Sequence, residues 1–163
     1  MTVIVLGIDP GTANTGYGVV LAHGQRLAAL DGGVIATDAH EPLERRLVRI
    51  HARVCDLIRE HAPQAVAIED LFFGNNARSA FSVGQARGAV MLSAGICGVR
   101  AYSYTPQAVK QAVCGSGRAE KGQVQRMVQA LLSLEDVPEP DHAADALAVA
   151  ICHANGAPLR AAV

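Results

Sequence analysis

The chain has 163 residues, of which half are apolar and 18% are charged, and its formal net charge is -1. This length suits one compact domain, and the apolar fraction is high enough to bury a core, which argues against a disordered chain. No apolar run reaches the roughly 20 residues that a membrane span needs.

The N-terminal segment and the cysteines predict a cytoplasmic protein. Residues 1–6 carry no basic leader and lead into Gly7 and Asp9, so they indicate a strand and not a signal peptide. The four cysteines are scattered, with no C-x-x-C pair, which is typical of free thiols in a reducing compartment. We therefore expect a cytoplasmic protein that does not associate with a membrane.

The first strands predict an antiparallel meander. Val3–Ile8 is a continuous apolar run that ends in a Gly/Pro turn, as a buried strand does. Tyr17–Ala22 and Leu27–Thr37 are two further apolar and β-branched runs, joined by a hairpin connection at 23–25. Three short strands in succession favour antiparallel pairing.

A helix and a fourth strand follow. From Glu41 the apolar residues recur at steps of three and four, so we expect an amphipathic helix with Pro42 in its first turn. Ala65–Glu69 is the next buried strand. If it pairs in parallel with the first strand, the helix is the crossover between them.

The rest of the chain predicts mainly helices. A loop at 70–77 precedes a helix over 80–96, whose small residues let another helix approach closely, inside the fold or across a dimer. The other expected elements are a strand at Val99–Tyr104, helices at Pro106–Val113 and Gln123–Leu132 joined by a loop at 115–122, and a last helix from 139–141 to about His153.

These elements predict an α/β fold with a mixed central sheet. A three-strand antiparallel meander is joined by parallel strands, and helices flank the sheet. The sequence has no internal repeat and no linker that would divide domains. We expect residues 1–154 to form a single domain and residues 155–163 to form a flexible C-terminal tail.

Charge is distributed unevenly along the chain. Residues 78–126 carry seven basic side chains against Glu120 alone, whereas residues 1–77 and 127–163 are net acidic. Such asymmetry is expected where one face meets phosphates and another gathers carboxylates. An ordinary solvated face gives the same pattern, so charge alone leaves both interpretations open.

Three carboxylates occupy positions in the expected strands and helices from which they could form one site. Asp9 ends the first strand, Glu69 ends the fourth, and Asp145 lies in an otherwise apolar helix, where a buried carboxylate is costly unless it is paired or bound to a cation. Oxygen-only clusters suit Mg²⁺ or Mn²⁺, and two such ions about 4 Å apart clamp an in-line phosphoryl displacement. Each acid alone also fits a turn, a strand end or an ion pair, so the coincidence of all three carries the prediction.

His142 precedes Asp145 by three residues, so both project from one face of the helix. We expect His142 to be a fourth metal ligand or a proton-transfer group. A lone histidine on a helix is more often a surface or core residue, and the nearby Asp145 is what favours a functional role.

A set of collinear motifs spans nearly the whole chain. The turn Gly7-Ile8-Asp9-Pro10-Gly11-Thr12 is followed by motifs at 15–18, 69–72, 76–78, 84–88, 106–111, 119–121 and 141–148. Together they resemble the RuvC family of crossover junction endodeoxyribonucleases. The resemblance implies an RNase H-like fold and a homodimer that makes paired, metal-dependent nicks in opposed strands of a four-way (Holliday) junction during recombination and repair. It also implies association with the branch-migration complex of the same pathway.

The family's four catalytic and metal-binding positions match Asp9, Glu69, His142 and Asp145, which implies Mg²⁺ or Mn²⁺, with two ions in each active site. The third position is often aspartate in the family and is His142 here. Because Mn²⁺ accepts imidazole more readily than Mg²⁺, we expect a preference for Mn²⁺. Asp141 is adjacent, but one helical step turns it about 100° away, so the identity of this ligand stays open between the two residues.

Five residues are expected to bind DNA. Lys110 and Lys121 are the only lysines, and both match family positions at the DNA backbone or the active site. Phe72 follows Glu69 in a polar loop, where an aromatic ring can stack on an unpaired base or serve as a buried loop anchor. The basic segment that contains Arg78 and Arg118 would hold phosphates without reading sequence.

Three other functions fit part of the pattern. A kinase or ATPase of the actin–hexokinase type also has an Asp-x-Gly-Thr turn after its first strand, but it needs two such lobes, which one domain of this length does not supply. An RNase H-like nuclease acting on RNA precursors shares the Asp9 turn, yet the motifs around Lys110 and Lys121 favour the resolvase. A junction-binding protein without catalysis has no need of the intact acid set.

Overall fold

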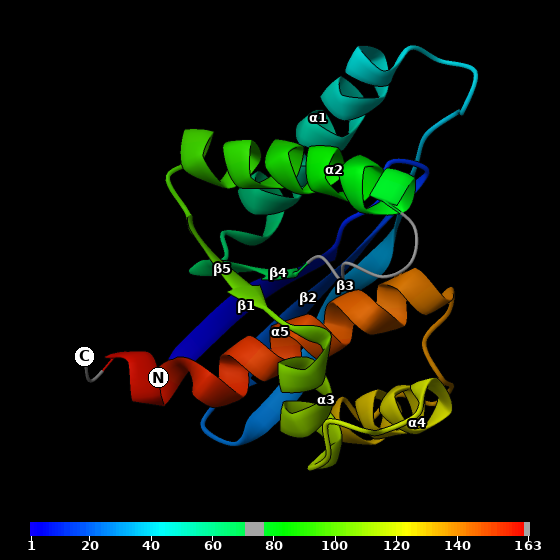
Figure 1. The fold of residues 1–163 in the computed structure, drawn as a ribbon. Helices are drawn as coiled ribbons and strands as arrows, with labels where there is room; N and C mark the ends of the chain where they lie inside the picture. The colour runs from blue at the N-terminus through cyan, green and yellow to red at the C-terminus, as the bar shows by residue number, and fades with distance from the viewer. Residues whose placement is uncertain (71–76, 162–163) are drawn as a thin grey trace.

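The structure, a computed structural model, describes residues 1–70 and 77–161, with side chains as far as residue 156. It has three layers, a central sheet with α1 and α2 on one face and α3, α4 and α5 on the other (Figure 1). The strands are β1 (Thr2–Asp9), β2 (Asn14–His23), β3 (Arg26–Ala36), β4 (Ala65–Glu69) and β5 (Arg100–Tyr104), and the helices are α1 (Leu43–His61), α2 (Ala77–Ile96), α3 (Pro106–Cys114), α4 (Lys121–Leu131) and α5 (Asp141–Ala161).

The five strands lie in the order β3-β2-β1-β4-β5. β1, β2 and β3 form antiparallel pairs, and the hairpin between the last two turns at Gly24, whose φ of 60° favours glycine. β1 pairs in parallel with β4, and β4 in parallel with β5. The predicted meander and the predicted parallel pairing of the first and fourth strands are confirmed, with α1 as the crossover.

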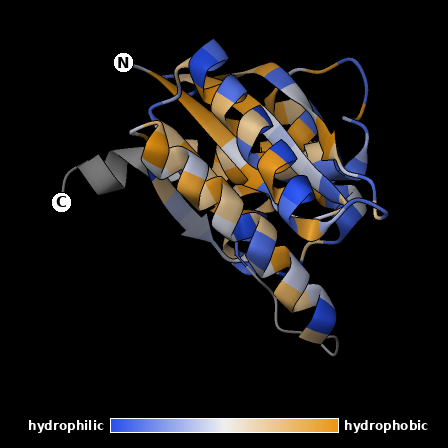
Figure 2. Ribbon diagram, turned by 90° about the horizontal axis from the view of Figure 1, so that it is seen from above, coloured by the Kyte–Doolittle hydropathy of each residue, from blue (hydrophilic) through white to orange (hydrophobic). Residues whose placement is uncertain are grey.

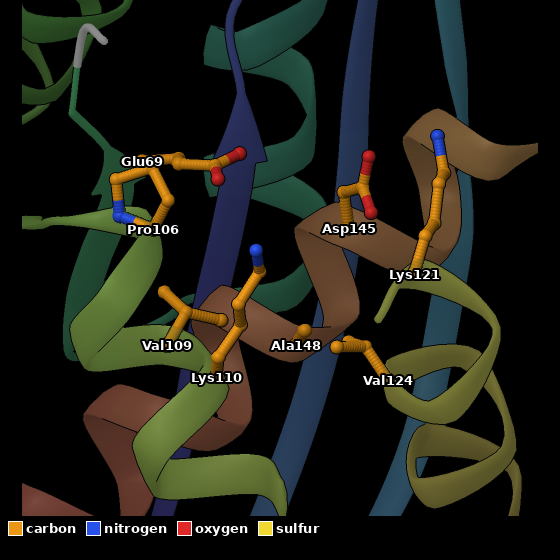
Figure 3. A pocket seen from close by; sticks show the side chains of 8 residues that line it. All are labelled: Glu69, Pro106, Val109, Lys110, Lys121, Val124, Asp145 and Ala148. Carbon is orange, nitrogen blue, oxygen red and sulfur yellow. The ribbon is translucent and has the colours of Figure 1, made fainter. Parts of the chain in front are cut away.

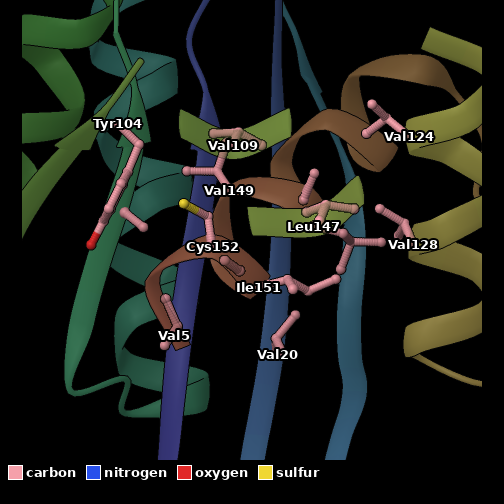
Figure 4. Packing of buried hydrophobic residues seen from close by; sticks show 14 of the residues in the cluster. Val5, Val20, Tyr104, Val109, Val124, Val128, Leu147, Val149, Ile151 and Cys152 are labelled. Atoms are coloured by element: carbon pink, nitrogen blue, oxygen red, sulfur yellow. The ribbon is translucent and has the colours of Figure 1, made fainter. Parts of the chain in front are cut away.

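Alternation along the strands divides the core into two halves. Leu6 and Ile8 of β1 pack against α1 and α2. Val5 packs on the opposite face with side chains of α3, α4 and α5 (Figure 4). Because successive strand residues point to opposite faces, Asp9 belongs to the α5 face, and the same alternation along β4 puts Glu69 there as well.

Helix α2 has one buried side and one exposed apolar side. Ala86, Val90 and Ala94 are fully buried in the core half shared with α1. Their small size lets α2 lie close to its neighbours, as the sequence predicted. On the other side, Phe81 and Leu92 are 71% and 58% exposed.

Glycines let α5 lie directly on the sheet. A Cβ atom placed on Gly7 would stand 2.1 Å from the carbonyl oxygen of Ala146, and one placed on Gly16 would stand 2.0 Å from that of His142. Both separations are far below van der Waals contact, so any side chain at these positions would push the helix away. The depth of α5 on β1 and β2 therefore depends on the absence of β-carbons at such positions.

Several helix boundaries differ from the predictions. α1 begins at Leu43, so Pro42 is its N-cap residue and not part of its first turn, and α2 begins at Ala77, three residues before the predicted start. α4 begins at Lys121, inside the segment predicted as a loop, because Glu120 adopts the extended backbone of a helix cap immediately before it. α5 continues to Ala161, so residues 155–161, predicted as tail, extend the helix beyond His153. Gly156 and Pro158 lie within this extension, and each lowers helix stability without forbidding continuation. Among the described residues, none of the helices combines the length and apolar composition needed to cross a bilayer.

We expect Gly7→Ala to lower the free energy of unfolding by about 1–3 kcal/mol, the usual cost of overpacking a core. The added methyl group would meet the backbone of α5, which cannot move aside as a flexible side chain can. Urea unfolding measures the change. Gly32→Ala in β3 is the matched control, because its Cβ would meet nothing closer than 3.7 Å. Equal destabilisation by both substitutions would show that the close approach of α5 is not the cause.

Candidate active site

The register of the parallel pair β1–β4 brings two of the predicted acids together. Ile8 lies opposite Ile68, so the next residues along the two strands, Asp9 and Glu69, end neighbouring strands at the same edge of the sheet. Both side chains belong to the α5 face by strand alternation. The carboxyl groups are close enough for Glu69 to share a hydrogen bond with Asp9.

Helix α5 adds Asp145 and His142 to this edge. His142 Nδ1 lies 3.3 Å from Asp9 Oδ2, and the histidine side chain is 47% exposed against 19% for Asp9. Asp145 is half-buried one helical turn further along, and its charge acts on both Asp9 and Glu69. The structure therefore places all four residues that the sequence predicted as metal ligands at one edge of the sheet, with His142 in contact with Asp9.

Burial and mutual repulsion raise the pKa of two of these carboxyls. The pKa of Glu69 rises to about 8, mainly through burial, then through the charge of Asp9 and the hydrogen bond with it. Burial and the charge of Asp9 raise the pKa of Asp145 to about 6. Lys110 acts on Glu69 and Lys121 on Asp145 in the opposite direction, but neither lysine outweighs burial. A cation bound among these groups would favour their ionised forms.

A cavity of about 220 Å³ opens beside the cluster. Glu69 and Asp145 lie on opposite sides of it, Lys110 of α3 extends between them, and Lys121 of α4 lies beyond Asp145 (Figure 3). Apolar residues complete the lining: Pro106, Val109, Val124 and Ala148. Two carboxylates and two ammonium groups thus share one small volume, an arrangement that can hold metal ions and a phosphate at the same time.

Asp141 and His142, which the sequence left as alternatives, have different partners. Asp141 Oδ2 lies 3.1 Å from Lys121 Nζ, and its Oδ1 accepts a hydrogen bond of 3.0 Å from Gln125. The hydrogen bond from Lys121 lowers the pKa of Asp141 and raises that of the lysine. Asp141 is therefore bound to α4, whereas His142 contacts Asp9.

A second hollow, of about 520 Å³, lies on the other side of Asp9. It is lined by the turn after β1, by His142 and by the first turns of α2, including the exposed Arg78. Arg118 is exposed in the loop before α4. Phe72, predicted to stack on a base, lies outside the described residues.

A separate group of possible metal ligands lies elsewhere in the fold. Asp31 of β3 meets Glu60 and His61 at the end of α1. His61 Nε2 is 3.0 Å from Asp31 Oδ2, and Arg53 is 3.4 Å from Glu60. These ion pairs account for the group without a metal.

Comparison with known proteins decides the family. The family described as crossover junction endodeoxyribonuclease RuvC matches residues 5–153. The chain belongs to the RuvC family. RuvC of Moorella thermoacetica is 54% identical over 157 residues, covering 96% of this chain and 94% of the relative. RuvC of Desulfitobacterium hafniense is 52% identical over 152 residues, covering 93% and 92%.

Solved structures agree with this RuvC assignment. Thermus thermophilus RuvC is 43% identical and superposes with a TM-score of 0.90, covering 96% of both chains. The same protein in complex with a Holliday junction substrate gives a TM-score of 0.92, covering 97% of this chain and 96% of that one. The yeast mitochondrial Holliday junction resolvase, 14% identical with a TM-score of 0.63, shares the fold alone. The predicted RNase H-like fold is confirmed.

Sequence reasoning missed one pair of residues beside the RuvC site. It counted Arg87 among the basic residues of 78–126 and gave Asp70 no role. Asp70 directly follows Glu69 in the chain, and its Oδ1 atom lies 3.2 Å from Nη2 of Arg87. Two features of the sequence could have indicated this pair: Asp70 is a second acid directly after Glu69, and Arg87 lies within the motif at 84–88.

In the metal-free protein we expect stability to fall as the pH rises from about 4.5 to about 8. Glu69 titrates near 4.5 when exposed and near 8 in the fold, so within this window the folded state keeps a proton that the unfolded state has lost. The free energy of unfolding therefore decreases with pH, by up to about 1.4 kcal/mol for each unit of pKa difference. Urea unfolding in EDTA between about pH 5 and pH 9 measures the effect.

Glu69→Gln removes this proton linkage and keeps the shape of the side chain. Relative to wild type, the variant should gain stability as the pH rises and level off above about pH 8. Glu135→Gln, at an exposed position before α5, should follow wild type throughout. If the difference in free energy of unfolding between Glu69→Gln and wild type stayed constant with pH, the pKa of Glu69 would not be raised in the folded protein.

Proposed function

We propose that Asp9, Glu69, Asp145 and His142 hold the divalent ions at which this enzyme cuts each strand of a four-way DNA junction. RuvC membership makes the chain a crossover junction endodeoxyribonuclease, which resolves Holliday junctions in recombination and repair. One observation carries the assignment of the site: carboxylates from β1, β4 and α5 lie within electrostatic reach of one another at one edge of the sheet, beside a cavity that two lysines also line.

The donor set fits a hard divalent cation. Carboxylates that raise each other's pKa are stabilised in ionised form by a cation, and carboxylate oxygens are the preferred ligands of Mg²⁺ and Mn²⁺. Cleavage depends on a divalent metal, as in the RuvC nucleases, and we propose two ions in each site. Bound there, they would stabilise the charge that develops on the phosphoryl oxygens during in-line displacement.

The basic side chains bind and orient the DNA. Lys110 and Lys121 line the same cavity as the carboxylates, so they would hold the phosphate that is cut. Arg78, exposed at the hollow beside Asp9, and Arg118, exposed in the loop before α4, would contact phosphates further along the strand. For Phe72 we keep the proposal of base stacking at the junction centre.

The enzyme would act as a homodimer through the outer side of α2. Phe81, Met91, Leu92 and Ile96 are exposed there, with Val48 of α1 also exposed. Figure 2, seen from the side of α1 and α2, shows hydrophobic residues along these helices. An apolar helix face of this kind is typical of an interface, and two copies supply the two active sites that paired nicks require. Contact with a branch-migration complex and a cytoplasmic location belong to the same proposal.

Asp9→Asn, Glu69→Gln and Asp145→Asn should each reduce cleavage of a synthetic four-way junction by about a hundredfold or more. Each removes an anionic ligand that helps to stabilise charge in the transition state. Wild type should leave symmetric nicks that a ligase can seal. Junction binding in EDTA should be retained, because none of these changes removes a phosphate contact. A variant that cleaves like wild type at saturating Mn²⁺ would remove that residue from the catalytic set.

Lys110→Ala and Lys121→Ala should each lower the cleavage rate by about tenfold or more, because each removes a cation that faces the reacting phosphate. Arg45→Ala, on the exposed side of α1 and outside the basic segment, is the control for a general loss of positive charge. Single-turnover cleavage rates at low and high salt compare the three. Equal effects would mean that only non-specific attraction is lost.

His142 should make the enzyme more active with Mn²⁺ than with Mg²⁺, because Mg²⁺ seldom takes a nitrogen ligand. A ligating histidine must be neutral, so metal affinity should fall at acid pH, where the imidazole binds a proton instead of the metal.

The test for His142 is His142→Asp, assayed with both metals across about pH 6 to 9. If the variant gains cleavage activity with Mg²⁺ relative to Mn²⁺, and its activity falls less steeply toward acid pH than that of wild type, both results support ligation by His142. An unchanged metal preference would assign this residue to proton transfer or to no role in the reaction.

A further inference from the structure

Arg87 differs from the exposed arginines of the basic segment. Only 25% of its side chain is exposed, and its Nε atom is buried without a hydrogen-bond partner among the described residues. Nη2 donates to Asp70 Oδ1 at 3.2 Å and also to the hydroxyl of Ser103, and Nη1 lies 3.3 Å from the sulfur of Met91. The guanidinium group is therefore held between α2 and the ends of β4 and β5.

These contacts fix the residue that directly follows Glu69. Asp70 is held by its side chain to Arg87, and its backbone N–H donates to the carbonyl of Tyr104 at 2.8 Å. Ser103, the second acceptor of Arg87, pairs with Ile68, the residue directly before Glu69. The backbone on both sides of Glu69 is thus connected to one guanidinium group.

Helix α2 also contacts the turn that follows Asp9. The hydroxyl groups of Ser82 and Thr12 lie 2.5 Å apart. The carbonyl of Thr12 accepts a hydrogen bond from the hydroxyl of Thr37, which in turn accepts one of 2.8 Å from Arg46 Nε. One helix therefore braces the chain after Asp9 and the chain after Glu69.

This bracing counteracts the electrostatic repulsion among the carboxylates. The charge of Asp9 raises the pKa of both other carboxyls, so these groups repel each other in the ionised state that metal binding requires. Glu69 is the last residue of its strand, and directly after it the backbone is tied to β5 by the hydrogen bond from the Asp70 N–H to the carbonyl of Tyr104. A charge-assisted hydrogen bond to the next residue restrains the backbone there and also pairs the negative charge of Asp70.

We propose that Arg87 is a positioning residue that acts through Asp70 to hold Glu69 in register with Asp9, and so sets the affinity of the carboxylate cluster for divalent metal. The inference rests on the proposed function, since it takes Glu69 and Asp9 as ligands of the same metal centre. Arg87 is in this view not a phosphate contact, in contrast to Arg78.

The test compares Arg87→Met, which keeps the aliphatic length, with Asp70→Asn and the double variant. Mn²⁺ affinity is measured by calorimetry on the DNA-free protein, and junction binding is measured in EDTA. We expect each single variant to bind Mn²⁺ about 10–100-fold more weakly, as is usual when a partner of a metal ligand is lost. Junction binding should stay within about twofold of wild type. The double variant should bind Mn²⁺ no more weakly than the weaker single variant, because the two residues act as one unit.

Arg45→Met, on the exposed side of α1, is the control and should retain Mn²⁺ affinity. If Arg87→Met does not fold, Asp70→Asn carries the test, because Asp70 is 34% exposed and its substitution leaves the core intact. Unchanged Mn²⁺ affinity, additive effects in the double variant, or weakened junction binding with normal Mn²⁺ affinity would each overturn the inference.

Wild type and Glu69→Gln are measured in parallel. A wild-type protein that does not cut junctions would overturn the proposed function, while the Mn²⁺ affinities would still decide the role of Arg87. An active wild type whose Mn²⁺ affinity is unaffected by Arg87→Met would overturn this inference alone.

Discussion

The close approach of α5 to the sheet is the constraint on which the site depends. The helix backbone lies so near β1 and β2 that a β-carbon on Gly7 or Gly16 would stand about 2 Å from one of its carbonyl oxygens. At this depth His142 comes within 3.3 Å of Asp9 and Asp145 comes within electrostatic reach of both strand-end carboxylates. A helix held further out by side chains on these strands would still cover the core, but its polar residues would no longer meet Asp9 and Glu69.

The cluster that results is unfavourable until a cation is bound. Burial and repulsion raise the pKa of Glu69 to about 8 and that of Asp145 to about 6, so the metal-free site holds protons that a bound ion would displace. The fold tolerates this because the charges are carried by elements anchored elsewhere: two central strands and a helix whose apolar residues are almost entirely buried. Rigid elements keep the carboxylates together, so the geometry need not be built by the metal.

Positive charge in residues 78–126 serves more than one purpose. Lys110 and Lys121 line the cavity with the carboxylates, and Lys121 is also paired with Asp141. Arg78 and Arg118 are exposed, whereas Arg87 is directed inward to Asp70 and Ser103. Counting charges along the chain predicts a surface for phosphates, but it does not separate a side chain that faces DNA from one that braces the protein.

Most of the fold and three of the site's carboxylates were predictable from local pattern. The apolar runs, the turn after Asp9 and the parallel pairing of the first and fourth strands predict that Asp9 and Glu69 end neighbouring strands, because strand alternation and register follow from chain geometry. Local pattern did not decide whether His142 or Asp141 reaches Asp9, where α5 ends, or which partner Arg87 takes. Those outcomes depend on how deeply α5 lies on two glycine-bearing strands and on where α2 crosses the ends of β4 and β5. They are contacts between segments far apart in sequence, so only the packed tertiary structure determined them.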